Sequence, residues 1–186
     1  MSKRKLKKPN QSKGIKKRIY QVIVLIVAIA FILFFVFPNP FMNEANKEEK
    51  KLNGYSAFEF TKEGELTFSD SLGNFISMID IEIADDDTRR ATGLMYRNKL
   101  EENQGMFFIF PSENYQSFWM RNTVLPLDIL FVNSKNEIVT IHKNTVPFDE
   151  SSYPSTKPAK YVVEVNAGFT DKYNIEVGDK ISWRRI

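Results

Sequence analysis

The segment Ser117–Val132, "SFWMRNTVLPLDILFV", decides the fold, because its second half predicts a β-strand that is apolar on both faces. Side chains of a strand point alternately to the two faces of its sheet, and from Leu127 onward Asp128 is the one polar residue on either face. Such a strand is typically central and covered on both sides. We therefore expect a β-rich core here, with Asp128 as a buried carboxylate that needs a partner.

Six further short segments, each bounded by turn residues, are also predicted strands. They are Ile79–Ala84, Met106–Phe110, Ser117–Arg121, Glu137–Lys143, Lys160–Asn166 and Lys180–Arg184. "NSKN" at Asn133–Asn136 predicts a hairpin turn. Because no βαβ rhythm is visible, the predicted fold class is α+β, mainly β: a small rolled antiparallel sheet or partial barrel with one covering helix, preceded by a single transmembrane helix.

The covering helix is predicted from "DDDTRRATGLMYRNKL", which begins at Asp85. Acidic residues stand where the positive end of the helix dipole lies, and Asp87 or Thr88 is expected to cap it. Three apolar residues are expected to form the buried face of this helix: Ala91, Leu94 and Met95.

Residues Ile19–Phe37 form an uncharged run of 19 residues, preceded by nine Lys or Arg in residues 1–18. A helix of this length spans roughly 28 Å, close to the hydrocarbon thickness of a bilayer. A signal peptide usually has a shorter apolar region, of about 7–15 residues, and a small-residue cleavage site. A buried core helix needs no cations before it. The run therefore predicts an uncleaved membrane anchor.

This anchor sets the expected domain organisation. By the positive-inside rule, residues 1–18 form a basic cytoplasmic tail. Residues 19–37 then cross the inner membrane once, residues 38–53 form a Pro-, Asn- and charge-rich stalk, and residues 54–186 form an extracytoplasmic, periplasmic domain.

Composition excludes several classes of function. The net charge of +3 comes from the basic tail, since the other 168 residues hold 17 Lys or Arg against 23 Asp or Glu. We therefore expect no nucleic-acid partner. The chain has no Cys and one His, which excludes thiolate zinc sites, disulfides and a multi-His metal site within one chain. No metal and no cofactor is expected.

A second carboxylate is predicted to lie among apolar neighbours. In "YVVEVN", strand alternation places Glu164 beside Val162. On the predicted helix, Arg90 and Arg97 are nearly two turns apart and share a face, with Gly93 between them as a sign of close backbone approach. We expect a structural ion-pair network in which Arg90 and Arg97 face Asp128 and Glu164.

Four blocks of the chain resemble the family called domain of unknown function 192. They are "RRATGLMYRNKLEENQGMFFIF", "SFWMRNTVLPLDILFV", "YVVEVNAGF" and "IEVGDKI", and they follow the order of the family. The resemblance implies a secreted or membrane-anchored prokaryotic protein with a compact β-rich domain, and it implies no reaction. It marks as signature positions Arg90, Gly93, Met95, Arg97, Gly105, Met106, Trp119, Met120, Asn122, Thr123, Asp128, Glu164, Gly168, Gly178 and Asp179.

Two interpretations of the opening segment stay open. In the first, Trp119, Arg121, Asn122 and Thr123 form a ligand platform, in which the indole stacks on a ring and the polar groups bind hydroxyl or carboxylate groups. In the second, Asn122 and Thr123 satisfy the backbone of a turn before Pro126.

The leading functional hypothesis is a non-enzymatic module that binds a small polar or glycan-like ligand, or a partner protein, in the cell envelope. One alternative is a hydrolase of envelope carbohydrate that uses Asp128 and Glu164 as an acid/base pair, which requires two carboxyl groups about 5–9.5 Å apart. Another is a structural partner in a membrane complex. The membrane is itself an expected partner, because Ile19–Phe37 is expected to cross it. An envelope glycan or a protein would be a further partner.

Overall fold

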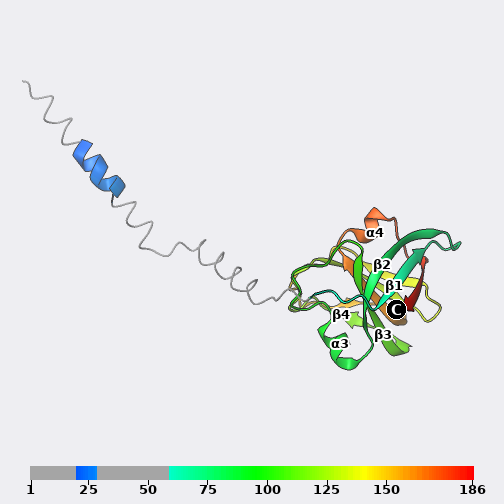
Figure 1. Cartoon of the computed structure of the whole chain (residues 1–186). Helices are drawn as coiled ribbons and strands as arrows, with labels where there is room; N and C mark the ends of the chain where they lie inside the picture. Colours follow the sequence, from blue (N-terminus) through cyan, green and yellow to red (C-terminus); the bar gives the residue numbers. More distant parts are fainter. Residues whose placement is uncertain (1–19, 29–58) are drawn as a thin grey trace, which may run out of the picture. The chain divides into compact units, whose positions relative to one another are not determined.

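A computed structural model of the chain describes residues 20–28 and 59–186 (Figure 1). The chain divides into two units, Met1–Lys50 and Lys51–Ile186, which are described separately. In the first unit, residues 20–28 form a helix with exposed side chains. No helix in the described ranges is long and apolar enough to cross a membrane. The rest of the predicted tail, anchor and stalk lies outside the described residues.

The second unit is mainly β-structure. Its strands are β1 (Gly64–Ser69), β2 (Phe75–Ala84), β3 (Gln104–Asn114), β4 (Ser117–Phe118), β5 (Leu127–Val132), β6 (Ile138–His142), β7 (Tyr153–Pro154), β8 (Ala159–Asn166) and β9 (Lys180–Arg185). Its helices are α3 (Asp87–Thr92) and α4 (Phe169–Lys172). The predicted strand Leu127–Val132 matches β5 residue for residue, whereas the predicted strand Ser117–Arg121 is wrong beyond Phe118.

Seven strands form one sheet in the order β6-β5-β8-β3-β2-β1-β9, and β4 pairs with β7 in a small second sheet. Each neighbouring pair of the large sheet is antiparallel except β2 and β3, which are parallel. The prediction of an antiparallel sheet is therefore wrong at this pair. Parallel neighbours need a crossover of about a dozen residues or more, and the connection that contains α3 supplies it.

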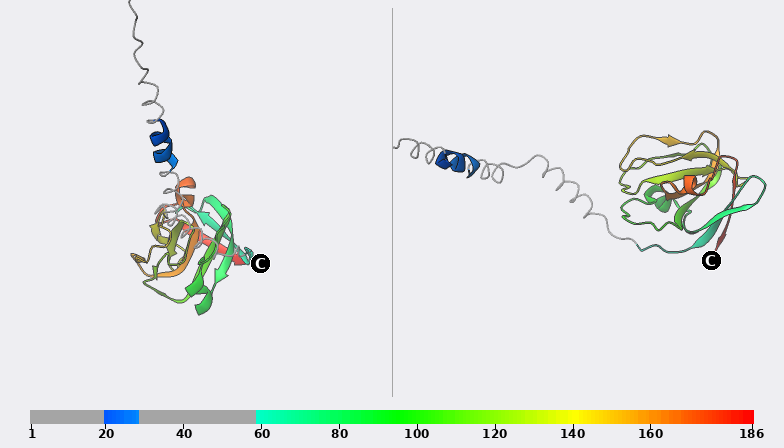
Figure 2. Two further views of the ribbon diagram at one scale, coloured as in Figure 1. Left: turned by 90° about the vertical axis from the view of Figure 1, so that its left-hand side faces the viewer. Right: turned by 90° about the horizontal axis from the view of Figure 1, so that it is seen from above.

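The large sheet rolls until its two edge strands meet (Figure 2). An antiparallel bridge joins Glu137, just before β6, to Lys180, the first residue of β9. The Ile138 amide donates to the Asp179 carbonyl over 2.8 Å, and the Gly178 amide donates to the Ile138 carbonyl over 2.9 Å. The prediction of a rolled sheet or partial barrel is confirmed by this closure.

Two apolar layers lie on the two faces of the rolled sheet. The inner core draws buried side chains from all seven strands, and α4 adds Phe169 to it. The outer core lies on the outside of β3, β5, β6 and β8, where Leu94, Met120 and Phe118 pack on the sheet. β5 is buried on both faces, as predicted, although it lies next to the edge strand β6 and not at the centre of the strand order.

The predicted covering helix is shorter than expected. α3 ends at Thr92, because Gly93 takes a φ of 48° that a helix cannot continue through. The cap is Asp86, whose carboxylate accepts a hydrogen bond from the Arg89 amide over 2.8 Å. Arg97 therefore lies in the segment after the helix, and the expectation that it shares a helix face with Arg90 is wrong.

Candidate functional site

A pocket of about 370 Å³ lies at the outer core. One wall is formed by residues 90–95, which are the end of α3 and the turn after it. The opposite wall is formed by residues 116–119 around β4, and β3 contributes Phe108 and Phe110. Thr123 and Glu164 complete the lining. The pocket therefore gathers Arg90, Trp119, Thr123 and Glu164, four of the residues singled out from the sequence.

Glu164 is the unusual member of this lining. It lies in β8 between Met106 of β3 and Ile129 of β5, which are its register partners in the sheet. Its exposed fraction is 5%, and no hydrogen bond or ion pair reaches its carboxyl group from the described residues. Burial raises the pKa of Glu164 to about 8, so this side chain is mainly a neutral carboxylic acid at pH 7.

The arginines that were predicted to pair with Glu164 are engaged elsewhere. Arg97 forms an ion pair with Glu82 of β2, and both side chains are largely buried. Arg90 donates to the carbonyl of Ile109 over 2.8 Å and to that of Asp85 over 2.6 Å. The predicted network of Arg90 and Arg97 with Asp128 and Glu164 is therefore wrong in its pairs.

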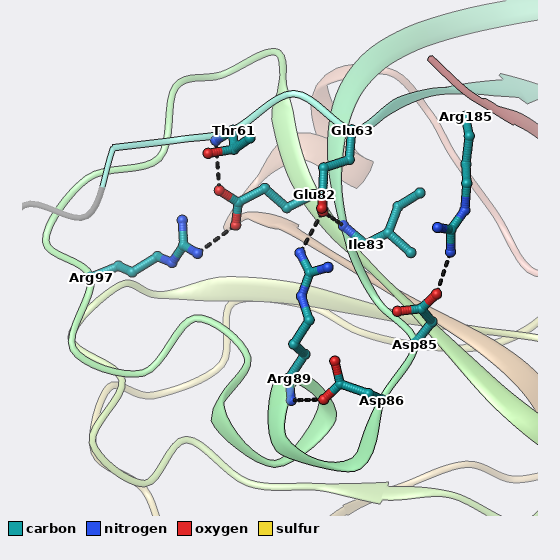
Figure 3. Close-up of polar contacts among 9 residues, drawn as sticks. All are labelled: Thr61, Glu63, Glu82, Ile83, Asp85, Asp86, Arg89, Arg97 and Arg185. Carbon is teal, nitrogen blue, oxygen red and sulfur yellow. Dashed lines mark hydrogen bonds and ion pairs between the residues drawn. The ribbon is translucent and has the colours of Figure 1, made fainter.

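An ion-pair network does exist around β2, whose member Glu82 lies on the same face of the sheet as Glu164 (Figure 3). Figure 3 shows Arg97 reaching Glu82, Arg89 reaching Glu63, and Arg185 reaching Asp85. The carboxylate of Glu63 also accepts a hydrogen bond from the backbone amide of Ile83 over 2.7 Å. These contacts fasten the entry to β1, the segment around α3 and the end of β9 to β2.

Trp119 stands at the opening of the pocket with an exposed fraction of 47%. The guanidinium carbon of Arg121 lies 5.3 Å from the centre of its ring, in the geometry of a cation–π contact. Behind the indole, Phe118 packs edge-on against Phe108 with ring centres 5.0 Å apart. A second hollow of about 310 Å³, lined in part by Glu150, shares Trp119 with the pocket. The indole is thus held in place and remains accessible.

The other two residues of the predicted platform support the backbone. Asn122 has a φ of 55°, a conformation that Asn tolerates better than most residues, and its amide donates to the Tyr96 hydroxyl over 2.8 Å. The Thr123 hydroxyl donates to the Arg121 carbonyl over 3.3 Å. Trp119 and Thr123 line the pocket, whereas Asn122 and Arg121 do not, and the ligand platform stays a prediction.

Asp128 lies on the other face of the sheet. It is paired with Val165 in the register that pairs Ile129 with Glu164, so the two carboxyl groups point to opposite faces. Its oxygens accept hydrogen bonds from the amides of Asn144 and Thr170, at 2.8 and 2.9 Å. The hypothesis that Asp128 and Glu164 flank one cleft as an acid/base pair is therefore wrong.

Two parts of the pocket were not singled out as site residues. Gly93 was predicted to mark a close backbone approach, and this is confirmed, because a Cβ built on it would lie 3.1 Å from Phe108 and 3.8 Å from Glu164; its place in the pocket wall was not predicted. Phe118 was read as one residue of a strand. The signal for both was present, since a glycine after a short helix and a run of aromatic residues are typical of a close packed wall.

No candidate metal site is found in the part of the chain that the structure describes. No group of three or more His, Cys, Asp or Glu residues is placed there to hold an ion. The pocket instead offers an aromatic platform, one guanidinium group and one neutral carboxyl group. These groups can bind a small polar ligand by stacking and hydrogen bonding.

Comparison with known proteins gives one consistent family. The uncharacterized family DUF192 matches residues 69–183. A UPF0127 protein of Pyrococcus furiosus is 31% identical over 113 residues, which cover 58% of this chain and 90% of the relative. A UPF0127 protein of Pyrococcus abyssi is 32% identical over 108 residues, which cover 55% of this chain and 85% of the relative.

Two solved structures have the same fold. One, from Sinorhizobium meliloti 1021, is described as a candidate transcription regulator; it is 35% identical, with a TM-score of 0.63, and the match covers 68% of this chain and 98% of that one. The other, a protein of unknown function from Novosphingobium aromaticivorans, is 36% identical, with a TM-score of 0.61 and coverage of 64% and 84%.

Proposed function

Because the chain belongs to the uncharacterised DUF192 family, whose membership assigns no reaction, we propose its function from the pocket: residues 59–186 form a binding module for a small, polar, ring-bearing ligand of the glycan type. One observation carries the proposal. The exposed indole of Trp119 and the unpartnered carboxyl group of Glu164 line the same pocket.

The size and lining of the pocket support this ligand class. A volume of about 370 Å³ is at the lower end of the range of roughly 300–1,000 Å³ for small-molecule sites. One or two sugar rings fit that space. An indole presents a flat apolar face to a sugar ring, while a carboxylic acid can donate to and accept from hydroxyl or carbonyl groups.

We also propose that the module is displayed on the outer side of the cytoplasmic membrane. The support is the sequence of the first unit: an uncharged run of 19 residues at Ile19–Phe37 behind nine basic residues, which is typical of a single-pass anchor with a cytoplasmic N-terminus. A ligand in the cell envelope, such as a glycan unit, suits that location. The acidic charge of residues 19–186 disfavours a nucleic-acid ligand.

Binding can be measured on the full chain in a zwitterionic detergent whose headgroup contains no sugar. D-glucose, N-acetyl-D-glucosamine and D-glucuronate are titrated by calorimetry. We expect saturable binding of at least one of them, lost in Trp119→Ala and retained in Tyr115→Ala, which removes another exposed aromatic ring outside the pocket. Heat of dilution alone for all three sugars would contradict the proposal.

The other hypotheses stand differently. The two-carboxylate hydrolase has lost its residue pair, because Asp128 and Glu164 lie on opposite faces of the sheet. A structural role in a membrane complex stays a prediction, and no contact of the described residues favours it over ligand binding.

A further inference from the structure

We infer that the pocket selects ligands that carry a carboxylate, which would be bound by the carboxyl group of Glu164 and attracted by the guanidinium group of Arg90. This inference rests on the proposed function and narrows its ligand class. It makes Glu164 the residue that determines specificity.

The charge balance of the lining is the first step. Of the described residues that line the pocket, only Arg90 and Glu164 carry titratable or charged side chains. An arginine stays charged in proteins. A carboxyl group that is buried without a cation is driven to its neutral form. The pocket therefore holds one fixed cation and one neutral acid.

The second step is the state of Arg90. Its side chain is 12% exposed, and two of its hydrogen bonds go to neutral carbonyl groups, those of Asp85 and Ile109. Its one ion-pair partner, Asp87, is fully exposed to solvent, where charge interactions are strongly screened. Three of the five guanidinium N–H groups are engaged in these contacts, so two N–H donors of this pocket-lining residue are left for a ligand.

The third step is the surroundings of Glu164 on every side. Its sheet neighbours are Met106 on β3 and Ile129 on β5, and the turn after α3 brings Gly93 against it. None of these three carries a charge. Beyond Met106, β2 places Glu82 on the same face of the sheet, where it is paired with Arg97. Apart from Glu164 itself, Arg90 is thus the one residue with an ionisable side chain among the described residues that line the pocket.

The hydrogen-bond requirement of a neutral acid completes the argument. A protonated carboxyl group has an O–H donor that needs an acceptor, and no described residue supplies one, so that role is left to water or to a ligand in the pocket. A ligand carboxylate is the strongest available acceptor, since a hydrogen bond between an acid and a carboxylate is short and charge-assisted. A neutral sugar hydroxyl can fill the same position only with a weaker bond.

Titration of Glu164 then controls affinity. Burial raises the pKa of Glu164 to about 8, so above that pH the side chain becomes an anion and repels a ligand carboxylate. Binding of an anionic ligand should therefore weaken by about tenfold for each pH unit above 8. Binding of a neutral ligand should change much less.

The experiment compares D-glucuronate with D-glucose on the full chain between pH 6.5 and 9.5. We expect glucuronate to bind at least tenfold more tightly than glucose at pH 6.5, and to lose that advantage above pH 8. In Glu164→Gln, whose amide still donates, glucuronate binding should persist without the alkaline loss. Glu150→Gln, which changes an exposed carboxylate at the neighbouring hollow, should behave as the unchanged protein does.

The outcomes separate the two proposals. Equal affinity for glucose and glucuronate, or glucuronate binding that ignores pH in the unchanged protein, overturns the carboxylate inference and leaves the binding module in place. Loss of glucuronate binding at pH 6.5 in a Glu164→Gln variant that melts normally also overturns it. Absence of binding for both of these sugars and for N-acetyl-D-glucosamine in the unchanged protein overturns the proposed function itself.

Discussion

Asp128 and Glu164 belong to neighbouring strands that pair residue by residue, yet their carboxyl groups point to opposite faces of the sheet. Asp128 faces the inner side and is saturated with hydrogen bonds, whereas Glu164 faces the pocket and has no described partner. The same chemical group therefore serves two roles, and the difference is set by strand register. Substitutions at the two positions should act in opposite directions.

Replacement of Asp128 should destabilise the domain. Its carboxylate accepts four hydrogen bonds, from the amides of Asn144, Gly168 and Thr170 and from the Thr170 hydroxyl at 2.7 Å. In Asp128→Asn one acceptor becomes an N–H group that faces these donors. We expect a loss of about 3 kcal/mol in the free energy of unfolding, seen as a fall in Tm of roughly 10 °C.

A nearby exposed aspartate provides the control. Asp171 lies on α4 and forms a surface ion pair with Lys143 over 2.6 Å. Asp171→Asn removes the same charge in the same part of the domain and should leave Tm almost unchanged. Equal shifts for the two variants would show that Asp128 acts through charge alone and not through its backbone hydrogen bonds.

Replacement of Glu164 should stabilise the domain at alkaline pH. The pKa of Glu164 is raised from an ordinary value of 4.5 to about 8, so between these values the folded state binds more protons than the unfolded state. The contribution of this group therefore falls as pH rises, by up to about 1.4 kcal/mol per unit, and levels off above pH 8. Glu164→Gln removes that loss.

The comparison is made by urea unfolding at pH 5, 6, 7 and 8, followed by tryptophan fluorescence. The stability of Glu164→Gln relative to the unchanged protein should increase steadily across this range. Subtraction of the two curves cancels the other titrating groups. A difference that stays constant with pH would mean that Glu164 is charged in the folded state and has a partner.

The outline of the fold could be predicted because its strongest signals are local. β5 is apolar on both faces over its whole length, and the hairpin turn at Asn133–Asn136 follows directly from its turn residues. β1 (Gly64–Ser69) was not predicted, although Leu66 and Phe68 alternate with polar residues as in a strand with one buried face. The parallel pairing of β2 with β3 depends on a crossover whose path the sequence does not specify.

The sequence predicted which residues belong to the site but not how their side chains pair. Trp119, Thr123, Glu164 and Arg90 were all singled out, but the expected partner of Glu164 was wrong. That choice depends on where α3 ends: once Gly93 stops the helix, Arg97 turns to a carboxylate on β2. The pairing of side chains depends on the tertiary structure, so a small error in a predicted helix boundary leads to wrong ion-pair partners throughout the site.

The ion pair of Arg97 with Glu82 should be essential to stability. Both side chains are largely buried, and Glu82 also accepts a hydrogen bond from the Thr61 amide over 2.8 Å. Arg97→Met leaves a buried carboxylate without its cation and should cost about 3–5 kcal/mol. Adding Glu82→Gln to this variant should recover much of the loss, because the amide oxygen still accepts from Thr61.

Urea unfolding of the single and double variants measures this coupling. Lys99→Met, which breaks an exposed pair with Glu101, is the control and should produce no measurable change. If the double variant were as unstable as Arg97→Met, the effect would come from the apolar packing of the arginine stem and not from the ion pair.

Gly93 connects the fold to the pocket, and its replacement should affect both. Its φ of 48° and ψ of −132° are unfavourable for any residue with a Cβ, so Gly93→Ala should cost on the order of 1–3 kcal/mol. The added methyl group would also lie 3.1 Å from Phe108 and 3.8 Å from Glu164. It therefore narrows the pocket at the carboxyl group that is proposed to bind the ligand.

A second glycine separates strain from loss of space. Gly178 also has a positive φ, 103°, but a Cβ at that position meets nothing within 4 Å. Gly178→Ala should therefore lower Tm without changing glucuronate affinity, whereas Gly93→Ala should lower both, with at least a tenfold loss of affinity at a temperature where each variant is folded. Unchanged glucuronate binding in folded Gly93→Ala would place the ligand away from Glu164, because the added methyl group presses on Phe108 of β3 and comes into contact with Glu164 at the wall of the pocket.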